Sequence, residues 1–305
     1  MMVHRYAFLL VKLSWVLVMS SLSDTDLQDA LKGISIPPQP QILVDIQMEQ
    51  AMPDPDMRRI ADLIRKDPAL AGTMLKIVNS PFFGARQSIT DIRQAVERLG
   101  LNLVFNILAG LSIKGALSDS SIVALTRFWD SAIDLAQACM LLAKHFKMRN
   151  PDEAYLLGLF HNCGIPLLLS KFPNYMTVLE QAYKQPNQLI TEYEWNQFKS
   201  HHAVIGYYIA RSWKLPAHLS NIINHHHDVQ DFFANLSGTA SEIAKNQQLM
   251  CILKVGEHIC GIAKIFSGQA HDLEWETIGP IVCDKLEIIA DDIADLRDEI
   301  LDQLN

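Results

Sequence analysis

The sequence is short of several residue types that mark specialised proteins. Its 14 glycines and 13 prolines among 305 residues are too few for a collagen or a low-complexity chain. Its five cysteines form no C-x-x-C pair and no zinc-knuckle spacing. Basic residues are outnumbered 26 to 34, which argues against a nucleic-acid partner, because such binders carry a basic surface. What remains is a globular protein with free cysteines, in which 49% hydrophobic residues can fill a core.

The N-terminal segment, residues 1–33, opens with an apolar run that is too short to span a membrane. Lys12 divides this run, and neither part approaches the roughly 20 apolar residues of a transmembrane helix. A clear signal-peptide cleavage site is also missing. We favour two interpretations over a signal or an anchor: an extra helix lying on the body, or a misassigned start at Met1 with Met19 opening the true chain. A cytoplasmic protein with no membrane span is therefore expected.

Helical periodicity dominates the rest of the chain, and strand patterns are nearly absent. Residues 57–66, 69–79, 101–117 and 128–146 are predicted helices, and 101–117 is apolar on nearly every face, as in the centre of a bundle. Pro151 and the two acidic residues after it favour the start of another helix. We expect an all-α fold: a multi-helix bundle in which an N-terminal helical lobe packs on a helical core, followed by a C-terminal helical extension.

The second half of the chain contains further helix signals. Thr191 and Glu194 have the spacing of a capping box and predict that a helix begins there. Residues 201–214 and 216–227 are predicted to form two helices separated at Pro216, because proline interrupts a helix.

The negative charge is concentrated at the C-terminal end. Residues 233–305 hold 13 acidic and 5 basic residues and carry the whole net charge of −8, whereas residues 1–232 sum to zero. Apolar residues recur in this segment at helical spacing, which predicts an amphipathic helix with an Asp-rich outer face. The recurring residues are Ile289, Ile293, Leu296, Ile300 and Leu304. The sequence thus predicts an acidic helical extension over residues 233–305.

Histidines are clustered in the middle of the chain. Seven of the eleven lie between His161 and His227, including the adjacent pair at 201–202 and the run at 225–227. Histidines that several helices bring together are one way in which a bundle builds a metal site. Histidine is also a common amphipathic residue, and three in a row fit an exposed surface. The residues by themselves leave both interpretations open.

A series of short motifs follows in a fixed order along the chain. The motif residues are Asp67, Pro68, Asn79, Ser80, Gly100, Trp129, Gly164, Trp213 and Pro216, together with His161-Asn162, His202 and His225-His226. This series resembles the HDOD domain, an HD-related output domain of bacterial signalling proteins. The resemblance covers residues 34–232 and implies an all-helical domain with an HD-like core, related to the metal-dependent HD phosphohydrolases.

Several motif residues have sufficient structural interpretations. Trp129 and Trp213 are expected to be core anchors. Gly100 and Gly164 are expected at helix ends or at points of close packing. Asn79 is expected to end a helix, and we also consider that its side chain ties the N-terminal lobe to the HD-like core.

The resemblance also implies that the metal site of the HD phosphohydrolases is degenerate here. Those enzymes hold one or two divalent metal ions with histidine and aspartate ligands. The bridging aspartate corresponds to Asn162, whose amide offers one neutral oxygen. The first histidine corresponds to Ser131, and the last aspartate falls loosely near Glu257. The expected relict pocket consists of Ser131, His161, Asn162, His202, His225 and His226.

Four histidines of this pocket could still hold one ion, although no catalytic residue and no cofactor are expected. Imidazole nitrogens suit zinc or nickel, but these ligands lack the anionic charge that offsets a dication. We expect at most an adventitious divalent metal. The candidate ligands are His161, His202, His225 and His226.

Two main functions follow from the sequence. The first is a non-catalytic signal-transduction or regulatory module that contacts a partner protein, or senses a small ligand or nucleotide in the relict pocket. The candidate contact surface is the groove between the two lobes. The alternative is a divergent metal-dependent phosphohydrolase that acts on nucleotides or cyclic dinucleotides. A purely structural adaptor is a third option, and the sequence defines neither the pathway nor the oligomeric state.

Overall fold

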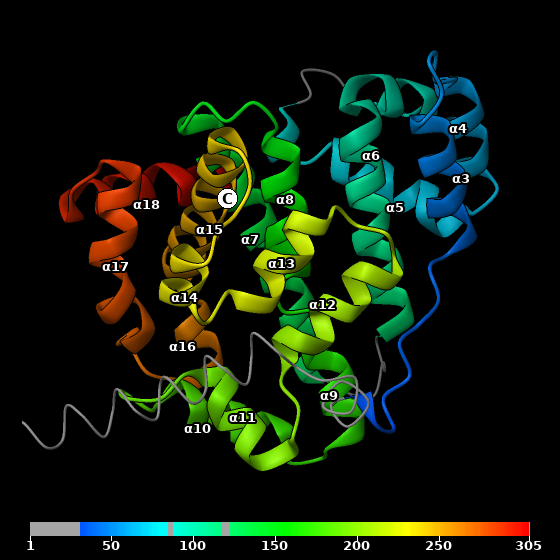
Figure 1. The fold of residues 1–305 in the computed structure, drawn as a ribbon. Helices are drawn as coiled ribbons and strands as arrows, with labels where there is room; N and C mark the ends of the chain where they lie inside the picture. Colours follow the sequence, from blue (N-terminus) through cyan, green and yellow to red (C-terminus); the bar gives the residue numbers. More distant parts are fainter. Residues whose placement is uncertain (1–30, 85–87, 118–122, 305) are drawn as a thin grey trace, which may run out of the picture.

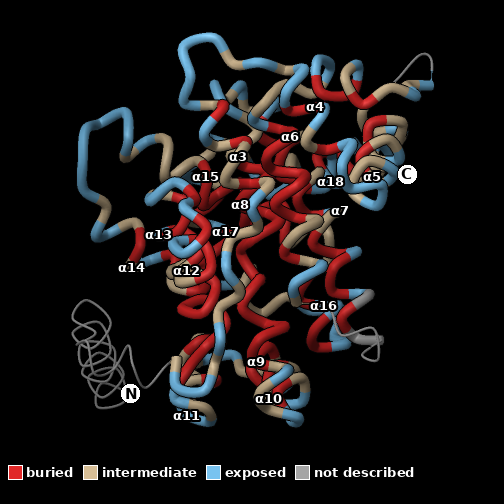
Figure 2. The backbone as a smooth tube through the Cα atoms, turned by 90° about the vertical axis from the view of Figure 1, so that its right-hand side faces the viewer, coloured by how far each residue is buried: buried red, intermediate tan, exposed pale blue. Residues whose placement is uncertain are grey.

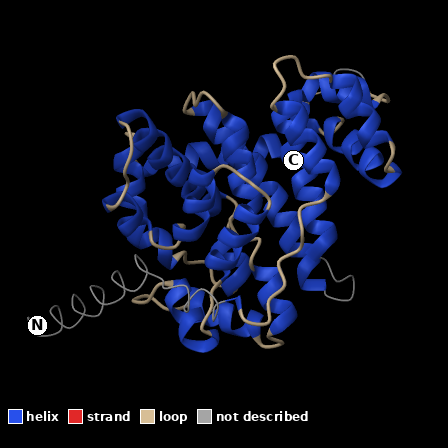
Figure 3. Ribbon diagram, turned by 45° about the vertical axis from the view of Figure 1, so that its right-hand side comes forward, coloured by secondary structure: helices blue, strands red, loops and turns tan. Residues whose placement is uncertain are grey.

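The computed structural model describes residues 31–84, 88–117 and 123–304 (Figure 1). The expectations about the first thirty residues therefore lie outside the described residues. Within the described ranges all regular structure is helical and no strand occurs, which confirms the all-α prediction (Figure 3). The elements are α3 (Gln41–Gln50), α4 (Met57–Arg65), α5 (Pro68–Val78), η1 (Pro81–Phe83), α6 (Ile92–Leu117), α7 (Val123–His145), α8 (Pro151–Phe160), α9 (Ile165–Lys171), α10 (Tyr175–Tyr183), α11 (Ile190–Phe198), α12 (His202–Ser212), α13 (Ala217–His225), α14 (Val229–Ala234), α15 (Ala240–Ile259), α16 (Ile262–Ser267), α17 (Leu273–Leu286) and α18 (Ala290–Leu304).

The helices pack in two groups, an N-terminal lobe and a second group that contains α7, α8, α15 and α17. Helices α3, α4 and α5 pack against α6 and form the N-terminal lobe. Helices α7 and α8 pack closely on each other, and α15 lies against both of them and against α17. Figure 1 shows α7, α8 and α15 between the N-terminal lobe on the right and α17 on the left. Buried residues concentrate along these central helices, whereas exposed residues follow the loops and outer faces (Figure 2).

Helix α6 links the N-terminal lobe to the rest and bends at Gly100. This residue has φ 75° and ψ 163°, so the helix stops and restarts there, and only glycine adopts such a conformation readily. Among the described helices, α6 alone has the length and apolar composition to cross a membrane. Half of its most apolar window is buried inside the protein, and α6 contacts α3, α4, α5 and α8. It is accordingly the core helix that the sequence predicted for residues 101–117.

Local hydrogen bonds explain where the helices of the N-terminal lobe begin and end. The side chain of Asp67 caps α5 by accepting from the backbone of Ala69 and Leu70, with Pro68 in the first turn. Asn79 follows α5 and exchanges two hydrogen bonds of 2.7 Å with the backbone of Ile89. Asn79 therefore closes the loop between α5 and α6 within the N-terminal lobe. The hypothesis that it ties this lobe to the HD-like core was wrong, because the loop itself satisfies its side chain.

The predicted capping box at Thr191 and Glu194 is not formed. Helix α11 starts at Ile190 with no side-chain cap, and Glu194 is completely buried. A capping box does occur at the start of α15, where Thr239 and Glu242 bond to each other's backbone N–H. The S/T-x-x-E pattern predicts a cap only when its acidic residue stays at the surface, and Glu194 instead points into the core.

The C-terminal segment packs as an amphipathic helix. Ile293, Leu296 and Ile300 of α18 are buried, and the helix lies against α7 and η1. Ile289 is 65% exposed, because the helix begins one residue later and its backbone N–H is bound by the side chain of Asp292. The predicted amphipathic helix is confirmed. The first of its predicted apolar positions, Ile289, lies just outside the helix and is exposed.

Candidate histidine pocket

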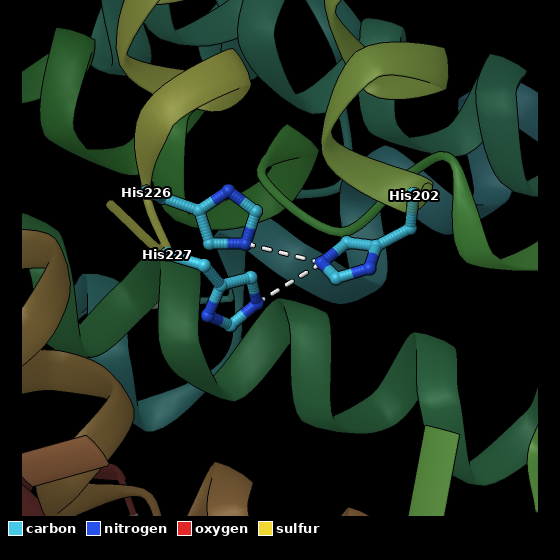
Figure 4. Close-up of side chains that lie close together, drawn as sticks. All are labelled: His202, His226 and His227. Carbon is cyan, nitrogen blue, oxygen red and sulfur yellow. Dashed lines mark hydrogen bonds between the residues drawn. The ribbon is translucent and has the colours of Figure 1, made fainter. Parts of the chain in front are cut away.

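Three segments bring buried histidines together beside α15. His161 ends α8, His202 opens α12, and His226 and His227 follow directly on α13. The exposed fractions of these four side chains lie between 0% and 3%, so the rings are sealed from solvent. We call these four residues the histidine pocket. Figure 4 shows the rings of His202, His226 and His227 directed at one another.

The third predicted histidine of the pocket, His225, is not part of it. Its Nδ1 donates to the carbonyl of Asn221 at 2.9 Å, and its half-buried ring lies near that of Phe232. The next two residues of the run turn inward, because the chain leaves α13 at this point. His227, which the sequence analysis left out, therefore takes the place that was predicted for His225.

Each ring of the histidine pocket donates its Nδ1 proton to a fixed acceptor. The acceptors are backbone carbonyls and carboxylates, which cannot donate, so the proton must sit on Nδ1. In a neutral ring the Nε2 atom then carries a free lone pair, whereas in a doubly protonated ring Nε2 donates as well. The four pairs are His161 with the Gly158 carbonyl (2.8 Å), His202 with the Glu194 carboxylate (2.7 Å), His226 with the Ile223 carbonyl (2.7 Å) and His227 with the Glu274 carboxylate (2.9 Å).

The Nε2 atoms converge on one another. That of His202 lies 3.3 Å from Nε2 of His226 and 3.1 Å from Nε2 of His227 (Figure 4). Ligand atoms of these three residues all lie within 4.8 Å of one another. Nε2 of His161 lies 3.3 Å from a carboxylate oxygen of Glu257.

A buried lysine lies next to the histidines. Nζ of Lys254 is 2.7 Å from Glu257 and 3.1 Å from Glu274, and its side chain is 1% exposed. Burial lowers the pKa of Lys254, but the two carboxylates outweigh this effect and raise it above its ordinary value. Burial likewise raises the pKa of Glu257, while Lys254 and then His161 lower it, and the net direction is down. Lys254 and Glu257 are therefore both charged at neutral pH.

The histidines next to Lys254 are held neutral. Burial is the main cause that lowers the pKa of His226 and His227 well below the usual value, and neighbouring histidines and Lys254 add to it. Neutral imidazole is the form that accepts a hydrogen bond or binds a metal at Nε2.

Two further residues were predicted for the pocket, Asn162 and Ser131. Asn162 is 3% exposed, and its side-chain oxygen has no hydrogen-bond partner among the described residues. The hydroxyl of Ser131 donates to the Phe128 carbonyl on its own helix. Glu257, which the sequence aligned only loosely, lies against His161.

The metal pair of the HD phosphohydrolases does not fit the residues at His161 and Asn162. Such a pair is bridged by a carboxylate with two anionic oxygens, and Asn162 offers a single neutral oxygen. The nearby carboxylate of Glu257 already pairs with the Lys254 ammonium. Two divalent ions would bring four positive charges to a position where the carboxylate of Glu257 is already paired with the ammonium group of Lys254.

The sequence analysis missed three charged residues of this region. Glu194 was interpreted as a helix cap, and Lys254 and Glu274 belong to the segment that was described only as an acidic extension. One signal was available: Lys254 stands in the apolar run Leu249–Val255, which is buried throughout. A lysine inside such a run indicates a buried ion pair.

An all-helical chain that gathers histidines from the end of one helix, the start of another and the turn after a third, beside a His-Asn pair, is an HD-like helical protein. The chain belongs to the HDOD domain family, whose profile matches residues 36–229. The predicted resemblance is thereby confirmed.

Two curated relatives match part of this chain. One is an uncharacterised protein of Treponema pallidum (strain Nichols), 31% identical over 201 residues, which are 64% of this chain and 38% of that protein. The other is the cyclic di-GMP phosphodiesterase CdgJ of Vibrio cholerae, 26% identical over 133 residues, which are 43% of this chain and 30% of CdgJ. Each match spans well under half of the relative.

Solved structures share the fold over nearly the whole chain. An HDOD domain protein of unknown function from Geobacter sulfurreducens has a TM-score of 0.62 at 19% identity, covering 92% of this chain and 97% of that one. A Marinobacter aquaeolei structure, provisionally described as a signal transduction protein, has a TM-score of 0.65 at 22% identity, covering 92% and 63%. A Shewanella amazonensis structure, provisionally described as a metal-dependent phosphohydrolase, has a TM-score of 0.59 at 17% identity, covering 96% and 98%.

Proposed function

We propose that this protein is a non-catalytic regulatory module of bacterial signal transduction, which works in the cytoplasm by contacting a partner protein or sensing a small ligand. The observation that carries the proposal is the ion pair between Lys254 and Glu257, which lies against His161. Where an HD phosphohydrolase needs carboxylates that are free to hold metal ions, this chain has an amide and a carboxylate committed to lysine.

The burial of the histidine pocket supports the same proposal. Hydrolysis of a phosphodiester needs a substrate phosphate and an attacking water next to the ligands. The four rings are at most 3% exposed, and His202 and His226 are completely buried. A nucleotide or a cyclic dinucleotide reaches such a pocket only if the surrounding helices separate.

The match to CdgJ favours hydrolysis of cyclic dinucleotides as the second candidate function. The matched segment is 30% of CdgJ, so its name does not assign an activity to this chain. This second function can be distinguished from the first, because hydrolysis of a cyclic dinucleotide would require divalent metal ions and an intact His161.

The test is a phosphodiesterase assay on the purified full chain. Cyclic di-GMP and bis(p-nitrophenyl) phosphate are supplied with Mg²⁺, Mn²⁺ or Fe²⁺, and phosphate-ester cleavage is measured beside a His161→Ala variant. We expect the same background rate in both proteins. A metal-dependent rate that His161→Ala abolishes would establish the phosphohydrolase and overturn the proposal.

A thermal-shift series separates the two modes of regulation. A ligand that binds only the folded state at 100 times its Kd stabilises the protein by about 2.7 kcal/mol, which moves the melting temperature measurably. A shift with a nucleotide supports ligand sensing, and the absence of shifts across nucleotides supports contact with a partner protein.

A further inference from the structure

Helix α3 carries apolar side chains on two sides, although only one side packs against other described helices. Five of its ten residues are apolar: Ile42, Leu43, Val44, Ile46 and Met48. Leu43 and Ile46 are completely buried where α3 contacts α4 and α6. A surface helix normally turns its apolar stripe toward the core and a polar face outward. Packing among the described elements therefore does not account for the apolar residues on the outer side of α3.

Two methionines dominate this outer side. Met48 is 65% exposed, and Met52, one turn later, is 56% exposed. The backbone hydrogen bonds at the end of α3 keep the chain in a helical turn as far as Met52. Val44, which is half-buried, lies one turn before Met48 on the same side of the helix. We call Val44, Met48 and Met52 the methionine face.

The methionine face lies on the outside of the N-terminal lobe. Figure 1 places α3 at the outer edge of this lobe, with α6 between it and α8, and Figure 2 turns this edge toward the viewer. Only four large apolar side chains of the described residues are exposed, and two of them belong to this face. Clustered exposed apolar residues mark interaction sites, and methionine is flexible enough to adapt to a partner's surface. The face is thus a candidate contact surface separate from the groove between the lobes.

The charged residues around the methionine face are mainly acidic. Asp45 lies on the same side of α3, and Asp54 and Asp56 are exposed in the loop that follows the helix. The carboxylate of Glu49 lies 3.3 Å from the guanidinium of Arg59, so these two charges offset each other. The remaining acidic side chains favour a partner that carries positive charge.

The two parts of the N-terminal lobe also differ in charge. Residues 41–59 hold four acidic and two basic residues, whereas residues 60–98 hold four acidic and six basic residues. The methionine face therefore belongs to the negative part of a lobe that is neutral over residues 41–98. Charge of one sign steers a partner of the opposite sign and fixes its orientation on the surface.

We propose that the methionine face binds a basic amphipathic helix of a partner protein, one with apolar residues on one side and lysines or arginines beside them. The apolar side chains of the face recur once per turn over two turns, and such a ridge packs against another helix. A contact of this length is small, which fits weak and reversible binding. The inference rests on the proposed regulatory function and names the surface and the partner chemistry for it.

The test measures binding of a labelled peptide of leucines and lysines at helical spacing to the full chain by fluorescence anisotropy. A matched peptide with glutamate in place of lysine is the comparison. We expect saturable binding of the lysine peptide that weakens at high salt, and no binding of the glutamate peptide. Replacing both exposed methionines, Met48→Ser with Met52→Ser, should weaken binding at least about 10-fold. Asp54→Asn should weaken it less, and only at low salt.

Ile289→Ser is the matched control, because Ile289 is also 65% exposed and lies in the acidic C-terminal extension. It should bind the lysine peptide as the wild type does, and circular dichroism reports whether each variant is folded. Failure of the wild type to bind the lysine peptide overturns the proposal, as does equal binding of the two peptides. A loss of binding in Ile289→Ser without a loss in the double methionine variant overturns it as well, because the peptide then binds the acidic extension.

Two further outcomes would assign the methionine face to another occupant and so overturn the proposal. If residues 1–30 of the same chain cover it, the double methionine variant should melt more than about 3 °C below the wild type. If a second copy covers it, light scattering should detect a dimer that the double variant dissociates. The peptide result is independent of the proposed function: phosphodiesterase activity would overturn that function without changing peptide binding, whereas failed peptide binding would leave regulation to other surfaces or to a ligand.

Discussion

Lys254 holds two carboxylates from different helices in a region that excludes water. It contacts Glu257 on its own helix and Glu274 on α17, and only 1% of its side chain is exposed. A buried ion pair of this kind adds little stability compared with an apolar replacement of the whole set, but loss of one partner leaves charge uncompensated. Lys254 therefore supplies the positive charge that compensates Glu257 and Glu274 beside the histidine pocket.

Replacing Lys254 by methionine should destabilise the protein by about 3–5 kcal/mol at pH 7, because the buried carboxylate of Glu257 and the partly buried carboxylate of Glu274 lose their cation. The pKa of Glu257 is lowered in the folded protein, so its stabilising contribution is present above its unfolded value near 4.5 and is lost as the pH falls through the folded value. The difference between wild type and variant should therefore shrink below about pH 4.5. Urea unfolding from about pH 3 to pH 8 measures this difference on both sides of the unfolded pKa.

Lys264→Met serves as the control, since Lys264 is exposed on α16. It should change the free energy of unfolding by less than about 0.5 kcal/mol. Equal effects of the two variants would mean that the Lys254 pairs do not balance the buried charge.

Single residues of the pocket could be predicted only where the motif itself names them. His161, Asn162, His202 and His226 follow from the resemblance. The choice between His225 and His227 could not, because it depends on where the chain leaves α13. Glu194 was assigned to the wrong role since the same spacing of residues serves a surface cap and a buried acceptor.

At the scale of the elements, α9 and α12 meet at a point where only glycine fits. A Cβ atom on Gly164 would lie 2.1 Å from the carbonyl oxygen of His202 and 2.9 Å from the backbone nitrogen of Gly206. Both are backbone atoms, so a side chain could be accommodated only by moving the first turn of α12. This contact therefore positions His202 as well as packing the helices.

Gly164→Ala should lower the free energy of unfolding by about 3 kcal/mol, as overpacking in a close contact does. It should also disturb the histidine pocket, because His202 moves with α12. Gly72→Ala is the control: Gly72 lies exposed in α5, and an added Cβ meets nothing within 4 Å. That change should stabilise the protein by about 0.5–1 kcal/mol. Chemical denaturation of the two variants compares them, and equal stability of Gly164→Ala and wild type would contradict the close contact.

Most helices were predictable because their ends carry local signals. Asp67-Pro68 and Pro151 mark helix starts through backbone chemistry that operates in any context. The bend at Gly100 was anticipated only as a helix end or packing point. How the helices associate depends on contacts between distant segments, which periodicity does not encode.

At the scale of the whole molecule, residues 233–305 are part of the same packed body as the preceding helices. Helix α15 lies against α7 and α8 and contributes a continuous buried stretch from Leu249 to Gly256, along with Lys254 and Glu257. The family profile matches residues 36–229, yet three of the charged residues beside the histidine pocket, Lys254, Glu257 and Glu274, come from beyond it. We infer that the matched region depends on the extension.

A chain that ends at residue 232 should fail to fold cooperatively, because it leaves the apolar faces of α7 and α8 uncovered. We expect loss of the thermal unfolding transition and strong binding of a hydrophobic dye. A chain that ends at residue 288 loses α18, which contributes three buried side chains, and should keep a weaker cooperative transition. A sharp transition in the 232-residue chain would show that the extension is dispensable.

The order of the pocket residues along the chain has a consequence for synthesis. The histidines are made first, and the acidic partner of His227 and the lysine that offsets its charge emerge from the ribosome later. Until α17 has been translated, His227 lacks the carboxylate that accepts its Nδ1 proton, whereas the acceptors of His161, His202 and His226 lie in segments made earlier. The histidine pocket therefore reaches its final electrostatic surroundings only after the C-terminal helices have been synthesised and have joined the bundle.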